Sequence, residues 1–148
     1  MDIRKGSDVE FGQSIYEPFG IAQLEPLTFG GICVFSSVCG CLGFLRDTTG
    51  GESVTNAIVA DYTNLDAHNY VDIEDLLQIN RSVRDQIEAV ESEKVAMQIC
   101  SRLPKNQAEI ESLLKTGYEL AKNMSWDVVV NNYLLSGLKK MPERVHIS

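Results

Sequence analysis

A stretch of 20 residues without a charged side chain, from Pro26 to Leu45, constrains the fold of this chain more than any other feature. The stretch approaches the length of a membrane-spanning helix. The pair Gly30–Gly31 interrupts it, however, and the central run Ile32–Ser36 is rich in β-branched and aromatic residues. This composition favours a buried strand flanked by glycine turns. We therefore expect a soluble protein.

Length and charge exclude several other classes. The 148 residues suit one domain with a substantial core. Thirteen Lys and Arg against 21 Asp and Glu give a formal net charge of −8, and Arg4–Lys5 and Lys139–Lys140 are the only adjacent basic pairs. A nucleic-acid or anionic-membrane partner needs a concentrated basic face, so we expect neither.

The cysteines indicate a reducing compartment. The N-terminal residues MDIRKGSDVE lack the apolar segment of a secretory signal. Cys33, Cys39 and Cys41 have the spacing C-x5-C-x-C, which matches no common zinc site, and both histidines lie far from them in the sequence. We expect Cys33, Cys39, Cys41 and Cys100 to be reduced core thiols in a cytoplasmic protein without a metal.

Residues 1–70 predict a βαβ core. Three apolar runs predict strands, at Val9–Gly12, Ile32–Ser36 and Ala57–Tyr62. Between the first two, Ile21–Phe29 predicts a short helix that ends at the glycine pair. Strand, helix and strand in this order imply parallel strands. The expected fold class is α/β, with a small, mainly parallel, Rossmann-like sheet.

Residues 71–148 predict a helical portion. Asp72 can cap a helix which, itself or through a successor, continues toward Ile99 and stops at Pro104. Its solvated face is expected to carry the acidic residues Glu88, Glu91 and Glu93.

Two further helices are expected after Pro104. Asn106 with Glu109 resembles a capping box before the first. Ser125 can cap the last helix, with Trp126 as its anchor in the core and Pro142 at its end. The expected inner stripe of that helix is Trp126, Val130, Tyr133, Leu134 and Gly137.

The connection after the first strand carries residues suited to ligand binding. Gly20 allows a close backbone approach, and the helix opening at Ile21 presents free N–H groups suited to a diphosphate. Glu17 and Glu25 bracket this site with seven residues between them. Carboxylates accept hydrogen bonds from sugar hydroxyls, so both residues in one cleft at the strand's carboxyl end would suit a nucleotide sugar.

These residues carry a family resemblance. The segment Glu17-Pro18-Phe19-Gly20-Ile21, followed by Leu24-Glu25-Pro26-Leu27, resembles the Glu-x7-Glu donor-binding motif of retaining glycosyltransferases with the two-domain GT-B fold. The segment IAQLEPL is similar to the glycogen and starch synthase branch, and residues 124–134 resemble that superfamily's closing helix. The likeness covers about residues 7–62 and 117–138, whereas residues 63–105 resemble no part of the family.

The resemblance implies roles for these residues. Glu17 would be the catalytic residue that contacts the donor sugar near the reacting centre, and Glu25 would bind the ribose. The backbone of Phe19, Gly20 and Ile21 would hold sugar hydroxyls and the distal phosphate. The donor would be a UDP- or ADP-sugar and the acceptor a glycan or similar molecule. Transfer would retain the anomeric configuration without a metal, with stabilisation of the departing nucleoside diphosphate as the main catalytic effect.

The sequence also departs from the family pattern. Cys39-Gly40-Cys41 replaces a Gly-Gly loop, and Gln13 stands where proline is common. The family's phosphate-neutralising Arg and Lys lie upstream of the motif, in a context that Arg4 and Lys5 do not share. We expect residues 1–148 to form a single partial nucleotide-sugar-binding domain, the C-terminal fragment of a transferase.

Such a fragment would lack the N-terminal transferase domain as its partner and be inactive alone. Its exposed strand edge would favour a homo-oligomer. The alternative is a non-catalytic Rossmann-like interaction module that docks on a partner through helices in the region 73–140. Glu17 and Glu25 would then be ordinary solvated carboxylates.

Overall fold

A three-stranded parallel sheet forms the centre of the molecule in the computed structural model, which describes residues 2–14, 17–65 and 72–140. Strands β1 (Val9–Gly12), β2 (Ile32–Ser36) and β3 (Ala57–Ala60) follow one another across the sheet, and Val34 pairs with both Phe11 and Ile58. Every residue of β2 is buried, as its apolar composition predicts. The mixed α/β class and the parallel sheet are confirmed.

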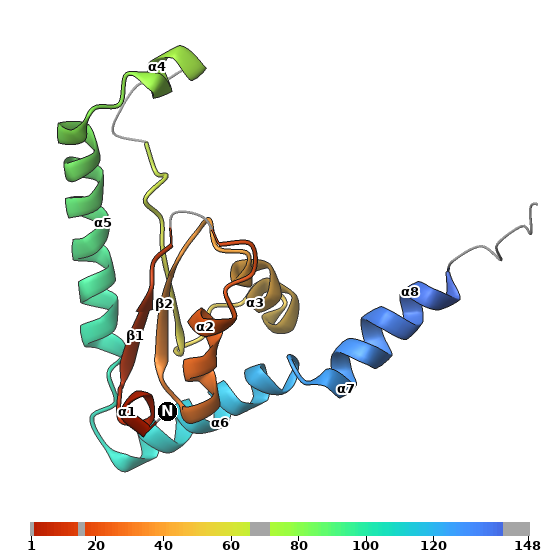
Figure 1. Ribbon diagram of the computed structural model, residues 1–148. Coiled ribbons are helices and arrows are strands. Elements are labelled where there is room, and N and C mark those ends of the chain that lie inside the picture. Colours follow the sequence, from red (N-terminus) through yellow and green to blue (C-terminus); the bar gives the residue numbers. More distant parts are fainter. Residues whose placement is uncertain (1, 15–16, 66–71, 141–148) are drawn as a thin grey trace, which may run out of the picture.

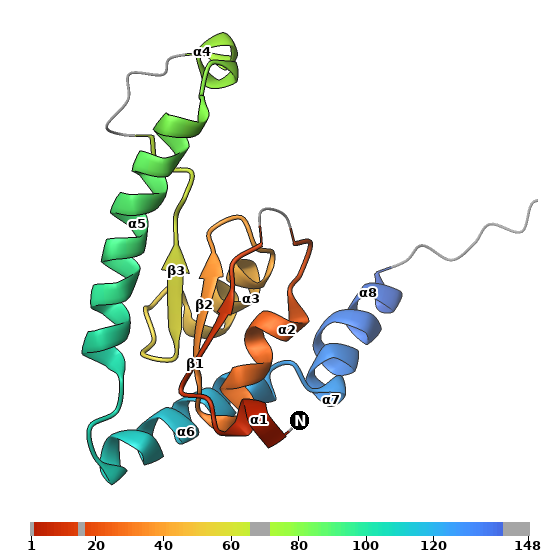
Figure 2. The same cartoon turned by 60° about the vertical axis from the view of Figure 1, so that its left-hand side comes forward.

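Helices cover both faces of this sheet (Figures 1 and 2). On one face lie α2 (Ile21–Leu24), the 3₁₀ helix η1 (Glu25–Phe29) and α3 (Cys41–Thr49). On the other face α5 (Arg81–Arg102) contacts β3. The core of the first face contains Leu24, Leu27, Cys33, Phe35, Cys41 and Leu45, and that of the second contains Ile32, Val34, Ile58, Val95 and Leu113.

The uncharged stretch is divided among three elements. Its first residues belong to η1, its centre is β2, and Cys41–Leu45 begin α3. Within the described ranges, no helix has both the length and the apolar character needed to cross a bilayer. The helix α3 was not predicted, because its glycine, cysteine and threonine content indicates a loop. Its buried Leu45 and Cys41 hold it on the sheet.

The helical portion is divided more finely than its periodicity indicates. Asp72 caps α4 (Ile73–Leu77) as predicted, its carboxylate accepting from the Asp75 amide at 2.9 Å. A separate cap, Asn80, then starts α5 and accepts from the amide of Val83 at 3.1 Å. Asn80 therefore begins a successor helix, one of the two arrangements that the prediction allowed.

Glu91 corrects the expectation that the acidic residues of α5 are all solvated. It is 6% exposed, and its Oε1 accepts a hydrogen bond of 2.8 Å from the backbone amide of Asp61, just after β3. Lys94 donates to the other carboxylate oxygen at 3.2 Å. Glu91 therefore fixes α5 to the carboxyl end of the sheet.

Helix α6 (Gln107–Lys122) crosses the opposite end of the sheet (Figure 1). Asn106 and Glu109 form the predicted cap, with the Glu109 amide 3.0 Å from Asn106 Oδ1. The buried Asn56 side chain donates to the carbonyls of Gly31 and Leu113, at 3.3 and 3.1 Å, and so connects α6 to the sheet.

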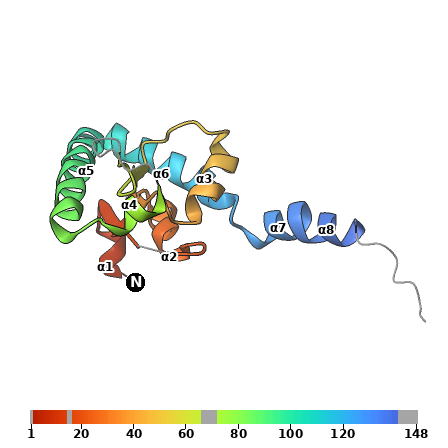
Figure 3. The same ribbon diagram turned by 90° about the horizontal axis from the view of Figure 1, so that it is seen from above.

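The C-terminal helices differ most from the expectation. Ser125 caps α7 (Trp126–Val129) as predicted, and the chain continues through the π-helical turn η2 (Val130–Leu134) into α8 (Leu135–Lys139). These elements extend away from the sheet (Figures 1 and 3), and Trp126 is 81% exposed. Trp126 is thus not the core anchor expected, because periodicity identifies an apolar stripe but not what covers it. The expected stop at Pro142 lies outside the described residues.

Candidate functional site

The residues of the Glu-x7-Glu motif follow β1 and reach the carboxyl edge of the sheet. Glu17 forms an isolated parallel bridge with Cys39, which lies just beyond β2. The Gly40 amide donates to the Glu17 carbonyl at 3.0 Å. This edge is where open parallel sheets bind ligands.

Gly20 occupies the tight turn before α2, as predicted. Its φ of +84° is in the left-handed region, which favours glycine. A Cβ atom at this position would lie 2.6 Å from Cys39 Sγ and 2.8 Å from Gln23 Oε1. The close approach at Gly20 is therefore made by the protein's own side chains, and Gly20 is buried.

Phe19 and Ile21 lie on either side of this turn, at the surface. Their exposed fractions are 42% and 66%, and the Phe19 ring meets the ring of Phe44 edge to face, with centroids 6.4 Å apart. The Phe19 carbonyl accepts a hydrogen bond from the Cys39 thiol at 3.4 Å. Within the described part of the chain no side chain caps α2, and the first N–H groups of a helix have no partner inside it. The predicted helix is only four residues long before it tightens into η1.

Glu25 lies at the start of η1 and is held by Arg4. The Arg4 guanidinium donates to Glu25 Oε2 and also binds both carboxylate oxygens of Glu10 on β1. The hydrogen bonds that Arg4 donates to Glu10, and then to Glu25, raise the pKa of Arg4 above its ordinary value, so it stays charged. Sequence reasoning missed this pairing, since 21 residues separate Arg4 from Glu25.

The two acids of the motif are therefore placed differently. Glu17 lies beside Cys39 at the carboxyl edge, whereas Glu25 lies at the far end of α2, paired with Arg4. A groove of about 380 Å³ lies beside β1 and contains neither acid of the motif; it is lined by Arg4, Glu10, Phe11, Gly12, Gln13, Ser14, Ala22 and Gln23. The Gln23 amide donates to the Ser14 hydroxyl at 3.2 Å across it.

Three of the four thiols are buried, as predicted. Burial raises the pKa of Cys33 to about 12. Cys41 Sγ lies 2.9 Å from Cys39 Sγ, and burial is the main cause of its raised pKa. Cys100 differs from the expectation, because it is exposed on α5.

Asp61 organises the edge beyond β3. Its Oδ1 accepts hydrogen bonds from the Thr63 hydroxyl at 2.6 Å, the Thr63 amide at 3.0 Å and the Ser37 hydroxyl at 2.9 Å. The Thr63 hydroxyl has the largest effect, and together these bonds hold the pKa of Asp61 below its usual value.

A lowered pKa in the folded state makes Asp61 stabilising at neutral pH, and this stabilisation is lost as the pH falls through the folded-state pKa. We expect Asp61→Asn to be less stable than wild type at pH 7, with the difference shrinking below about pH 4. Urea unfolding across this range measures the difference, with the exposed Asp47→Asn as control. A difference that is constant with pH would contradict the assignment.

Comparison of the chain with protein-family models, with curated proteins and with solved structures gave no match. Among residues 2–14, 17–65 and 72–140, no group of three or more His, Cys, Asp or Glu side chains could hold a metal ion.

Proposed function

We propose that this chain binds a nucleotide-sugar donor as the C-terminal, donor-binding part of a retaining GT-B-type glycosyltransferase, with a Rossmann-like sheet. One observation carries the proposal: the segment that resembles the family motif follows a parallel strand, and Glu17 at its start lies at the carboxyl edge of the sheet. Ligands of open α/β sheets bind outside that edge.

The residues of the segment supply complementary groups for such a donor. The amides at the Gly20–Ile21 turn would receive a phosphate oxygen, and the Glu17 carboxylate would accept hydrogen bonds from the sugar. Arg4 engages Oε2 of Glu25, which leaves Oε1 for a ribose hydroxyl. Arg4 itself is committed to two carboxylates, so neutralisation of the leaving diphosphate would fall to the Arg and Lys that the family carries upstream of the motif. Transfer would therefore need basic groups other than Arg4.

A second function has its own supporting observation. The C-terminal helices expose large apolar side chains, with Trp126 at 81%, Tyr133 at 63% and Leu138 at 53%. An apolar surface of this kind is typical of a protein-binding helix. A non-catalytic interaction module is therefore the alternative.

Amide NMR titrations with UDP-glucose and ADP-glucose distinguish the two functions. We expect one of these donors to shift the resonances of Gly20 and Ile21, and Glu25→Ala to weaken binding by about tenfold, the value of one hydrogen bond to a charged group. Glu111→Ala, an exposed position on α6, is the matched control and should bind as wild type. No shift with either donor, together with concentration-dependent self-association, would favour the interaction module.

A further inference from the structure

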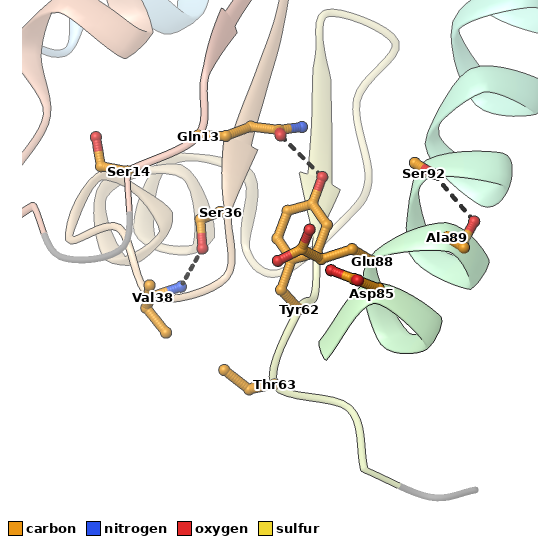
Figure 4. Close-up of a pocket in the computed structure, with 10 residues that line it drawn as sticks. All are labelled: Gln13, Ser14, Ser36, Val38, Tyr62, Thr63, Asp85, Glu88, Ala89 and Ser92. Atoms are coloured by element: carbon orange, nitrogen blue, oxygen red, sulfur yellow. Dashed lines mark hydrogen bonds between the residues drawn. The ribbon is translucent and has the colours of Figure 1, made fainter. Parts of the chain in front are cut away.

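A second pocket, of about 700 Å³, lies between the carboxyl edge of the sheet and α5 (Figure 4). All three strands contribute the residues that follow or end them, including Gln13, Ser36 and Thr63, and α5 contributes Asp85 and Glu88. In Figure 4 the Tyr62 ring lies between Gln13 and the acidic residues of α5, and its hydroxyl donates to Gln13 Oε1 at 2.8 Å. This pocket does not include the Glu17–Glu25 segment.

The wall that α5 provides is fixed in place. Glu91, one helical turn after Glu88 on α5, is buried, and its carboxylate accepts a hydrogen bond from the Asp61 amide. Val95 on the same helix packs against the apolar face of the sheet. Asp61 in turn binds the residues that follow β2 and β3. The pocket is therefore preformed, which reduces the free-energy cost of ordering it around a ligand.

The groups in the pocket select an uncharged, hydroxyl-rich ligand. Hydroxyls, a side-chain amide and two carboxylates line it, and no Lys or Arg does so among the described residues. Phosphates are disfavoured beside two carboxylates where no Lys or Arg lines the pocket, whereas sugar hydroxyls donate well to Glu88. The face of Tyr62 offers an apolar surface of the kind that a sugar ring covers.

A cation fits this pocket less well. Asp85 already has a cationic neighbour, because Arg81 Nε lies 4.0 Å from its carboxylate. Among the described residues only two carboxylates line the pocket, and none of them belongs to a cluster suited to a metal ion.

We propose that this pocket binds a neutral saccharide. The pocket lies at the same edge of the sheet as Glu17. If the proposed function holds, the pocket is a subsite for the glycan acceptor, a role that rests on that function. The proposal that the pocket binds a saccharide depends only on the residues that line it, and not on the proposed function.

Amide NMR titrations of the full chain with maltotriose, cellotriose, mannotriose and chitotriose test this proposal. At least one trisaccharide is expected to shift the resonances of Gln13, Ser36 and Thr63 at millimolar concentration. Glu88→Ala should weaken that binding by about tenfold. Glu93→Ala, an exposed glutamate on the same helix but outside the pocket, should leave it unchanged.

The outcomes separate this proposal from the proposed function. Glu88→Ala should retain the shifts that the nucleotide sugar causes at Gly20, and Glu25→Ala should retain the shifts that the trisaccharide causes at Thr63. If none of the four trisaccharides shifts these resonances, the proposed saccharide site is wrong, whatever the donor titration gives. Spermidine shifting the same resonances while the sugars do not would overturn it in favour of an organic-cation site.

Discussion

Replacing Gly117 with alanine is expected to destabilise the fold by about 2–3 kcal/mol, a large part of the stability of a domain of this size. Gly117 is the point on α6 where the helix meets η1, and a Cβ atom there would lie 2.3 Å from the Leu27 carbonyl oxygen. That oxygen belongs to the backbone and cannot rotate away. The helix must shift, and the Asn56–Leu113 hydrogen bond of 3.1 Å would shift with it.

The matched control is Gly43→Ala in α3, where a Cβ atom meets nothing within 4 Å. Alanine there should be neutral or stabilising by up to about 1 kcal/mol, because glycine is the poorer helix former. Urea unfolding followed by circular dichroism compares the two variants. Equal stabilities of Gly117→Ala and Gly43→Ala would show that α6 does not pack on η1 as described.

Strand β2 could be predicted from the sequence because every one of its residues is buried. In that setting short β-branched and aromatic runs give a clear signal, and β1 and β2 begin and end where predicted. Strand β3 ends at Ala60 rather than at Tyr62, since Tyr62 turns away to bind Gln13.

The helices were predicted less well, because tertiary contacts decide where several of them lie. The polar and small residues of α3 favour a loop, yet Leu45 is buried against the sheet. The acidic pattern of α5 could not show that Glu91 binds the Asp61 amide 30 residues away. The inner stripe predicted for the last helix is not covered in the structure, where Trp126, Tyr133 and Leu134 are all exposed.

The candidate site also combines features that the sequence predicts with features that depend on the fold. Local features, such as the glycine turn at Gly20 and its place after a strand, follow from the sequence. The Arg4–Glu25 ion pair and the pocket beside α5 depend on which segments the fold brings together, and no spacing along the chain indicates them.

Gly40→Ala is expected to weaken donor binding by about tenfold or more, because it displaces the segment that carries Glu17. A Cβ atom on Gly40 would lie 1.8 Å from the Pro18 carbonyl oxygen, and the 3.0 Å bond from the Gly40 amide to the Glu17 carbonyl depends on this close approach. Its φ of −61° suits any residue, so the effect is steric. The predicted Cys-Gly-Cys loop thus positions the motif through its glycine.

The cost to stability should be smaller than the cost to binding. The clash at Gly40 is with the exposed Pro18, whose segment can move away, whereas the Leu27 carbonyl at Gly117 lies between packed elements. We therefore expect a loss of about 1 kcal/mol, the value of one hydrogen bond. The donor that shifts Gly20 in wild type is titrated into Gly40→Ala and into Gly43→Ala, three residues further on and unhindered. We expect the affinity for the donor to fall in Gly40→Ala alone. The amide resonances of Phe19 and Gly20 should also shift in the spectrum of unliganded Gly40→Ala. Together these results would show that donor binding depends on the position of Glu17. Affinity unchanged despite that movement would place the donor elsewhere on the sheet edge and remove Glu17 from the site.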